Sequence, residues 1–97
     1  MPAYVIFIKE HTRDPIESQI YLARHDAFTT GHALTYRARF GRHETLEGPV
    51  TEGVAILEFP SYDEAKRWYL SPAYQDASKH RYLAGDYRAI IVEGVQP

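Results

Sequence analysis

Hydrophobic and polar residues alternate along this chain in short stretches that predict four strands. Residues 3–9 (AYVIFIK) are nearly all apolar and too few for a convincing helix, which predicts a strand covered on both faces. Residues 34–40 alternate apolar with polar side chains, as in a strand with one buried face. Residues 54–59 (VAILEF) and 87–92 are further apolar runs and predict the third and fourth strands.

A first helix is predicted between the first two strands. Asp14 and Pro15 supply a capping carboxylate and a proline at the first helical position, and Gly31 is a natural helix stop. The apolar residues expected to face inward recur at spacings of four, three and four: Ile16, Ile20, Ala23 and Ala27.

A second helical region follows the third strand and is interrupted once. Ser61 and Glu64 have the spacing of a capping box. Ser71 and Pro72 repeat the cap-plus-proline start, so we expect one helix to end there and another to run to about residue 84. Gly85 is the predicted stop of that last helix.

The resulting order is β-α-β-β-α-β, which predicts a single ferredoxin-like α+β domain over residues 1–97. In this fold a four-stranded antiparallel sheet has its helices on one face. Apolar residues also point to the other face of the first, third and fourth strands, and that face needs a cover. A second copy packed sheet against sheet supplies one, so we expect a homodimeric α+β barrel.

Composition limits the classes of function. The formal net charge of −2 gives no field to attract nucleic acid, and we expect no nucleic-acid partner. The absence of cysteine excludes disulfides, thiolate metal sites and a cysteine nucleophile. We see neither a signal-peptide pattern nor a membrane-spanning run, so we expect a cytoplasmic protein with no membrane partner. Eight Tyr, four Phe and one Trp exceed what one small core needs and suggest an aromatic pocket or interface.

Several recognisable segments are spread over nearly the whole chain. They are residues 3–6 (AYVI), 36–48 (YRARFGRHETLEG), 57–61 (LEFPS), 68–75 (WYLSPAYQ), Arg81 and residues 92–94 (VEG). In combination they resemble the domain of unknown function 1330 family. The resemblance implies a bacterial, ferredoxin-like, dimeric α+β barrel with no established general activity. Related barrels include cofactor-independent monooxygenases, polyketide cyclases, muconolactone isomerases and haem-handling proteins, so the fold alone selects no chemistry.

One position departs from that family pattern. In many similar family members, glycines follow the arginine that matches Arg39. This chain has Phe40 and Gly41 there instead. The bulky ring is expected to narrow or reshape a pocket at this point.

Arg39 is the first candidate for binding a ligand. It lies two positions from Arg37 and is therefore expected on the same face of the strand, where an unpaired guanidinium is costly to bury. Two partners remain open. One is a structural ion pair with Glu58 or Glu47, from this chain or a dimer mate, and such pairs commonly serve structure alone. The other is the carboxylate of a substrate.

His25 and Glu58 are the candidates for moving a proton. His25 follows Tyr21 by four residues on the first helix, so both rings can reach a space between helix and sheet. A neutral imidazole there exchanges protons near physiological pH. The alternative is an ordinary solvated histidine on a helix.

Three residues of the second helical region are candidates for ligand binding. Tyr69 and Tyr74 flank the break at Ser71, where the ends of elements tend to open a cleft, and their phenols can donate hydrogen bonds to a flat, oxygenated ligand. Arg81 follows Tyr74 by seven residues on nearly the same helical face and anchors either this helix or a ligand acid. Packing against the sheet is the alternative role of the two tyrosines.

We predict no metal site and no cofactor. No two of the five histidines stand three or four residues apart on one element, so a helical ligand pair is absent. Haem ligation by one histidine has no support beyond the presence of the side chain.

These observations favour a small-molecule-binding dimer whose helix–sheet cleft accepts a small carboxylated or aromatic metabolite. Cofactor-independent proton transfer or isomerisation is the activity that the candidate residues suit. The alternative is a non-catalytic ligand-carrying or assembly module whose polar residues pair only with each other. A shared, water-accessible cavity around His25 and Glu58 would favour catalysis.

Overall fold

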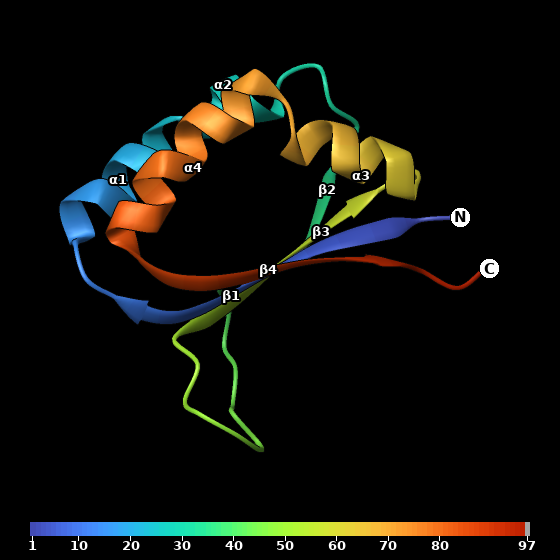
Figure 1. Ribbon diagram of the computed structural model, residues 1–97. Coiled ribbons are helices and arrows are strands. Elements are labelled where there is room, and N and C mark those ends of the chain that lie inside the picture. The colour runs from blue at the N-terminus through green and yellow to red at the C-terminus, as the bar shows by residue number, and fades with distance from the viewer. Residues whose placement is uncertain (97) are drawn as a thin grey trace.

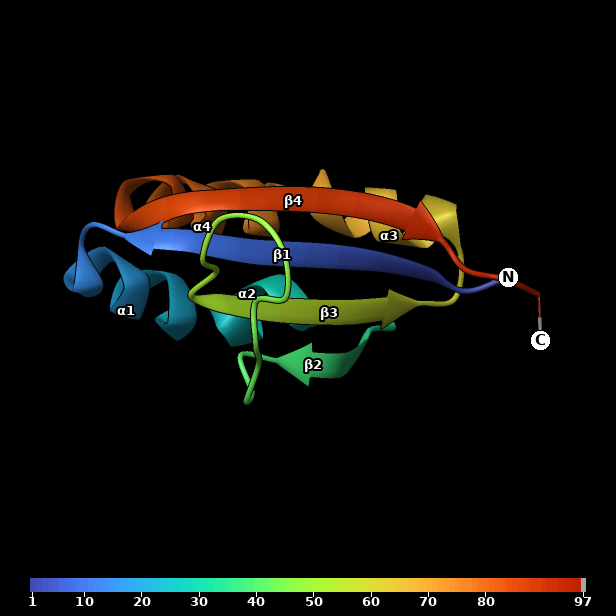
Figure 2. The same cartoon turned by 90° about the horizontal axis from the view of Figure 1, so that it is seen from below.

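The computed structural model describes residues 1–96 and has an antiparallel sheet with its helices on one face (Figure 1). The sheet order is β2-β3-β1-β4, seen edge to edge in Figure 2. The predicted ferredoxin-like α+β fold is thereby confirmed. The elements are β1 (Ala3–Thr12), α1 (Pro15–Ala23), α2 (His25–Thr29), β2 (Thr35–Arg39), β3 (Gly53–Phe59), α3 (Tyr62–Tyr69), α4 (Pro72–Ala84) and β4 (Gly85–Glu93).

The core lies between the helices and one face of the sheet. The side chains of β1 and β3 that face the helices are at most 4% exposed. They pack against Trp68 of α3 and Tyr74 of α4, both fully buried. The strand residues of this core are Ala3, Val5, Phe7, Ala55, Leu57 and Phe59.

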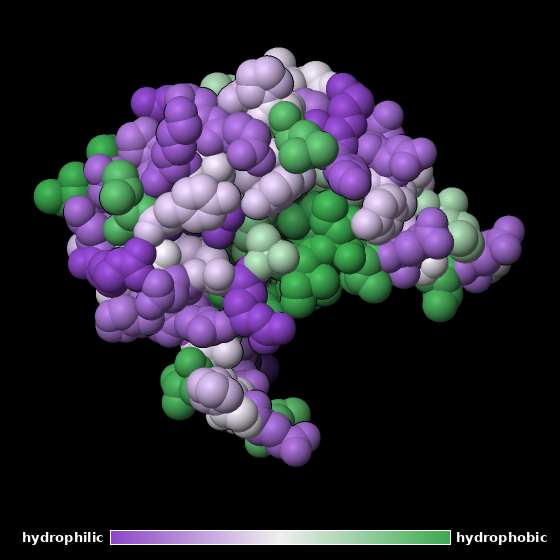
Figure 3. Space-filling view, in the orientation of Figure 1, coloured by the Kyte–Doolittle hydropathy of each residue, from purple (hydrophilic) through white to green (hydrophobic). Residues whose placement is uncertain are grey.

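The opposite face of the sheet is also apolar. Ile6 of β1 lies opposite Ile56 of β3 on one side and Ile90 of β4 on the other. Ile90 is 39% exposed and Val92 is 44% exposed. A separate hydrophobic area lies between the helix layer and the sheet edge in Figure 3. The expectation that the strands are apolar on both faces is met, and a second copy as the cover stays a prediction.

The capping side chains at the helix starts accept the predicted hydrogen bonds, although the Glu64 carboxylate pairs with Arg67 and does not complete the capping box. The Asp14 carboxylate accepts hydrogen bonds from the backbone N–H groups of Ile16 and Glu17. The Ser61 hydroxyl accepts from the Glu64 N–H at 3.1 Å, and the Ser71 hydroxyl caps α4 in the same way. The predicted break at Ser71 is confirmed, because it separates α3 from α4.

The first helical region differs from the prediction, because it breaks at Arg24 into α1 and α2. The predicted inward stripe is wrong: α1 has no buried residue and Ile16 is 68% exposed. The reason is that α1 lies along α4 (Figures 1 and 2), to which the ion pair of Arg24 with Asp76 ties it. The short α2 reaches the core instead, through Phe28, which is 3% exposed.

Gly85 is the C-cap of α4, which confirms the predicted helix stop, and it is also the first residue of β4. Its φ of 176° is extended, so the backbone conformation does not require glycine. A Cβ at this position would collide with the backbone carbonyl oxygen of His11 on β1. The glycine therefore permits the close approach of β4 to the end of β1.

Candidate ligand-binding site

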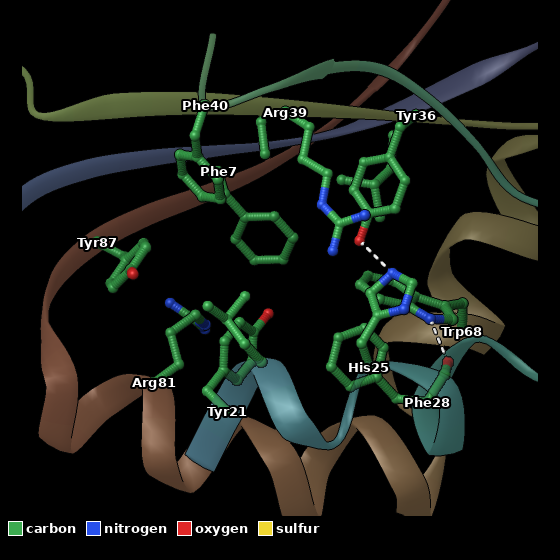
Figure 4. A pocket seen from close by; sticks show the side chains of 13 residues that line it. Phe7, Tyr21, His25, Phe28, Tyr36, Arg39, Phe40, Trp68, Arg81 and Tyr87 are labelled. Atoms are coloured by element: carbon green, nitrogen blue, oxygen red, sulfur yellow. Dashed lines mark hydrogen bonds between the residues drawn. The ribbon is translucent and has the colours of Figure 1, made fainter. Parts of the chain in front are cut away.

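An aromatic cavity lies between the helix layer and the sheet (Figure 4). Its free volume is about 30 Å³. Its walls come from all four strands and from helices α1 to α4. Its lining residues include Phe7, Tyr21, His25, Tyr36, Arg39, Phe40, Leu57, Trp68, Arg81 and Tyr87.

A register shift in β2 decides which side chains reach this cavity. Tyr36 lies opposite Leu57, whereas Ala38 lies opposite Ile56, so β2 has one extra residue between them. Such a bulge changes the side to which the following side chains point. Arg39 therefore lies opposite the core residue Ala55, on the helix side of the sheet.

Glu58, one of the partners that the sequence left open for Arg39, is paired with Arg37 instead. The Nε and Nη2 atoms of Arg37 donate to the two carboxylate oxygens of Glu58 at 3.2 and 3.3 Å. These hydrogen bonds lower the pKa of Glu58 from its ordinary value. The expectation that Arg37 and Arg39 share a face is wrong, because Arg37 contacts Glu58 on the open face while Arg39 lines the cavity.

Arg39 makes no ion pair with any carboxylate of residues 1–96. Its guanidinium carbon lies 4.5 Å from the centre of the Tyr36 ring, a cation–π contact. The guanidinium thus rests on an aromatic wall with its donor groups available. An anion that enters the cavity would meet a planar, permanently charged fork of donors.

His25 and Tyr36 are hydrogen-bonded to each other. Among the described lining residues, no other two titratable side chains are. The Nε2 atom of His25 lies 2.9 Å from the Tyr36 hydroxyl, and the rings stack at 5.6 Å (Figure 4). The His25 side chain is 23% exposed, and its Nδ1 lies 3.5 Å from the Asp26 carboxylate. Burial raises the pKa of Tyr36, although Arg39 lowers it in part, so this hydroxyl keeps its proton.

Arg81 is a second guanidinium in the cavity wall, and it is 3% exposed. Its Nε donates to the Tyr74 hydroxyl at 3.2 Å, and that hydroxyl lies 2.9 Å from the Tyr21 hydroxyl. Its guanidinium carbon lies 5.1 and 5.2 Å from the ring centres of Phe7 and Tyr87. Aromatic rings and a phenol, and no carboxylate of the described residues, therefore surround this buried charge.

The structure brings together three of the six predicted site residues: His25, Arg39 and Arg81 line one cavity. Tyr74 lies behind the wall, fully buried, and supports Arg81 through its hydroxyl. Tyr69 is half-buried in another hollow of the surface, beside Val5 and β4. Glu58 points to the open face, so His25 and Glu58 do not share a cavity within this chain.

Sequence reasoning did not identify Tyr36 or Tyr87 as site residues. Tyr36 precedes Arg39 by three positions, a spacing that puts two residues on opposite faces of a regular strand. Only the bulge brings them to the same face, and the sequence carries no local signal for it. The expectation that Tyr21 and His25 both reach a space between helix and sheet is met.

Three further findings concern the described residues. No three His, Asp or Glu side chains among residues 1–96 gather closely enough to hold a metal ion. His25 is the one imidazole of the described residues that lines the cavity. None of the helices in this part of the chain is long and apolar enough to cross a membrane.

The model of the family described as "Domain of unknown function (DUF1330)" matches residues 2–95. The chain belongs to the DUF1330 family. The resemblance seen in the sequence is thereby confirmed. No curated protein matches this DUF1330 chain significantly.

Solved structures similar to this DUF1330 chain share its fold at low sequence identity. A protein of unknown function from Rhodopseudomonas palustris is 21% identical with a TM-score of 0.68, over 99% of this chain and 84% of that chain. A dimeric ferredoxin-like protein of unknown function from Jannaschia sp. CCS1 is 14% identical with a TM-score of 0.74, over 97% and 100%. The cofactor-independent oxygenase SnoaB from Streptomyces nogalater is 17% identical with a TM-score of 0.60, over 99% and 94%.

Proposed function

We propose that this DUF1330 protein is a homodimeric barrel that binds a small, flat carboxylate in its aromatic cavity and transfers a proton on it without a cofactor. The observation that carries the proposal is the His25–Tyr36 hydrogen bond of 2.9 Å, which lies beside the unpaired guanidinium of Arg39. Proton transfer needs a group that accepts a proton near neutral pH and a nearby cation that stabilises the charge left on the substrate.

Binding follows from the chemistry of the cavity wall. The rings of Tyr36 and Phe7 offer apolar faces to a flat ligand. Arg39 supplies a planar fork of donors that matches a carboxylate, and Arg81 adds positive charge from the opposite wall (Figure 4). The favoured ligand is therefore a small ring compound with one acid group.

The His25–Tyr36 pair gives a direct route for the proton. The C–H bond next to a carbonyl group breaks, its proton passes to the Tyr36 oxygen, and the original phenolic proton passes to Nε2 of His25. The electron pair of the C–H bond stays on the substrate as an enolate, which Arg39 stabilises. Return of the proton to the same carbon gives exchange with solvent, and return to another carbon gives an isomer.

Phenylpyruvate in D₂O tests this proposal, because it combines a ring, a carboxylate and an exchangeable C–H bond next to a carbonyl. Proton NMR measures loss of the methylene signal above the rate in buffer alone. We expect His25→Gln and Tyr36→Phe each to lower the enzyme-dependent rate by about a hundredfold or more. His11→Gln is the matched control, since His11 is exposed and lies outside the cavity. Equal rates in all variants would refute the proposed proton transfer.

A non-catalytic ligand carrier is the second candidate. The carrier function is favoured by the position of Glu58, the other candidate for moving a proton. Glu58 pairs with Arg37 on the open face of the sheet, so it cannot act together with His25 in the cavity. The same NMR experiment separates the two functions. Phenylpyruvate that binds, as judged by protein chemical shifts, but exchanges only at the rate in buffer supports the carrier.

The homodimer is proposed on two grounds. The open face of the sheet is apolar around Ile6, Ile56 and Ile90. Proteins of the same fold from Jannaschia and from Thermobifida fusca are described as dimeric.

The similar oxygenase, described as cofactor-independent, supports leaving a cofactor out of the proposed chemistry.

A further inference from the structure

Phe40 has an unusual backbone conformation at the edge of the cavity. Its φ of 52° makes it the one non-glycine residue with positive φ among residues 1–96. A bulky side chain seldom adopts this left-handed region, and such strain persists only where the surroundings enforce it. The backbone is held by a hydrogen bond of 2.8 Å from the Phe40 N–H to the carbonyl oxygen of Val54 on β3.

The Phe40 ring lies in a seat that only glycine can provide. A Cβ at Gly53 would lie 2.7 Å from the Cδ1 atom of Phe40, closer than real Cβ contacts allow. The ring lines the cavity, yet the residue is 43% exposed. One side of the ring therefore faces the cavity and the other faces solvent, beside Arg39 (Figure 4).

The cavity is too small for a metabolite while this ring is seated. Its free volume of about 30 Å³ has room for roughly two water molecules. Pockets for small molecules usually measure a few hundred cubic ångströms. A lining group must move before a ring compound enters.

Phe40 and Leu22 are the two large apolar lining residues that are exposed, at 43% and 52%, and Phe40 is the aromatic one. Trp68 and Leu57 belong to the close-packed core, at 0% and 2% exposed. The hydrogen bond between His25 and Tyr36 restrains both of those rings. Phe40 is exposed and begins the β2–β3 loop, which projects away from the helices in Figure 1.

We propose that the Phe40 ring is a displaceable plug that determines which ligands reach the cavity. The ring fills the place that the ring of a single-ring aromatic carboxylate would occupy, and it swings toward solvent when such a ligand binds next to Arg39. The class of ligand rests on the proposed function. The plug itself does not, because opening can be measured with no ligand present.

Trp68 reports the opening directly, since it is the one tryptophan of the chain and lies in the cavity wall. Acrylamide quenching of its fluorescence measures access from solvent. Phe40→Asn removes the ring and keeps a residue that tolerates positive φ. Gly53→Ala pushes the ring from its seat without removing it. Tyr62→Ala is the matched control, because Tyr62 is 40% exposed and lies outside the cavity.

We expect the quenching constant to rise about threefold or more in Phe40→Asn and to rise also in Gly53→Ala, while Tyr62→Ala matches the original protein. The cooperative thermal transition should be retained in all three variants. A quenching constant that is unchanged in Phe40→Asn overturns the plug. A rise in that variant together with loss of cooperative unfolding, and with no rise in Gly53→Ala, also overturns it.

Benzoate binding followed by calorimetry separates the plug from the proposed function. A ring that is seated in about nine-tenths of the molecules lowers apparent affinity about tenfold, so Phe40→Asn should bind benzoate about tenfold more tightly. Equal affinity in the two proteins contradicts the plug. Increased quenching without benzoate binding to either protein supports the plug and counts against the proposed carboxylate ligand.

Discussion

Tyr36 and Arg39 lie on the same face of β2, with the guanidinium carbon 4.5 Å from the centre of the ring. Residues three positions apart point to opposite faces in a regular strand, and the extra residue between Tyr36 and Ala38 removes that opposition. One irregularity of β2 thereby joins an aromatic wall, a hydrogen-bonded imidazole and a free cation in one cavity. It also leaves Arg37 on the other face of the sheet.

Arg39→Ala is expected to weaken benzoate binding about tenfold to a hundredfold. Loss of a charge-assisted hydrogen bond costs about 1.5–3 kcal/mol. The free energy of unfolding should change by no more than about 1 kcal/mol, because the change removes only a cation–π contact at an exposed position. Calorimetry and urea unfolding measure the two quantities, and the dimer should stay intact.

Arg37→Ala is the matched control for that experiment. It removes an arginine two positions away whose partner is Glu58 on the open face. We expect its benzoate affinity to equal that of the original protein. Equal loss of affinity in both variants would mean that binding depends on the general charge of β2. An Arg39→Ala protein that fails to fold or dimerise would assign this arginine a structural role.

Ile6→Glu is expected to convert the dimer to a monomer. Ile6 lies at the centre of the open face, between Ile56 and Ile90, and a carboxylate buried there against apolar side chains lacks a partner. Light scattering coupled to size exclusion should show a dissociation constant at least about a hundredfold higher, since an unpaired buried charge costs several kcal/mol. Leu83→Glu on α4, where Leu83 is 59% exposed, should leave the mass unchanged. A dimer that tolerates Glu at position 6 would exclude this face as the interface.

The elements of the fold were predictable where the chemistry is local. A cap requires only a side-chain oxygen at the right position, and Asp14, Ser61 and Ser71 each accept the expected hydrogen bonds. The order of the elements along the chain followed from the sequence of apolar runs and helix caps. The break at Arg24 was missed because it serves contacts of α1 with α4, which residue spacing within one helix does not reveal.

The site was predictable only in part, because several of its side chains are placed by contacts between segments far apart in the sequence. Arg81 was identified from its position on a helical face, and burial against the sheet agrees with that position. Tyr36 and Arg39 reach the cavity together because of pairing with β3, and pairing register depends on a partner strand far along the chain. Glu58 was misplaced relative to His25, since the sequence alone did not fix which carboxylate meets which arginine.

Gly85→Ala is expected to destabilise the fold by about 3 kcal/mol, because the new methyl group collides with the His11 carbonyl oxygen on β1. This corresponds to a Tm lower by roughly 12–24 °C for a domain of this size. Gly41→Ala is the control, since a Cβ there meets nothing within 4 Å and the φ is not positive. It should leave Tm unchanged or slightly raise it. Similar Tm values for the two variants would contradict the close approach of β1 and β4.

Tyr74 should make the protein less stable at alkaline pH. Burial raises the pKa of its phenol from about 10 to about 12, with Arg81 opposing part of the rise. The folded state therefore holds its proton at a pH where the unfolded chain releases it, so this stability is fully present below about pH 10 and is lost as pH rises toward 12. The total is up to about 3 kcal/mol, because the pKa shift is about two pH units.

Tyr74→Phe tests that dependence through its slope. Losing the hydroxyl leaves Arg81 without its hydrogen-bond partner, so the variant should be less stable at neutral pH by about 1–3 kcal/mol. Between about pH 10 and 11.5, however, its free energy of unfolding should fall less steeply than that of the original protein, by up to about 1.4 kcal/mol per pH unit. Urea unfolding at several pH values measures both effects, with Tyr62→Phe as the control for loss of one phenol. Parallel curves for Tyr74→Phe and the original protein would mean that Tyr74 does not hold its proton more tightly when folded.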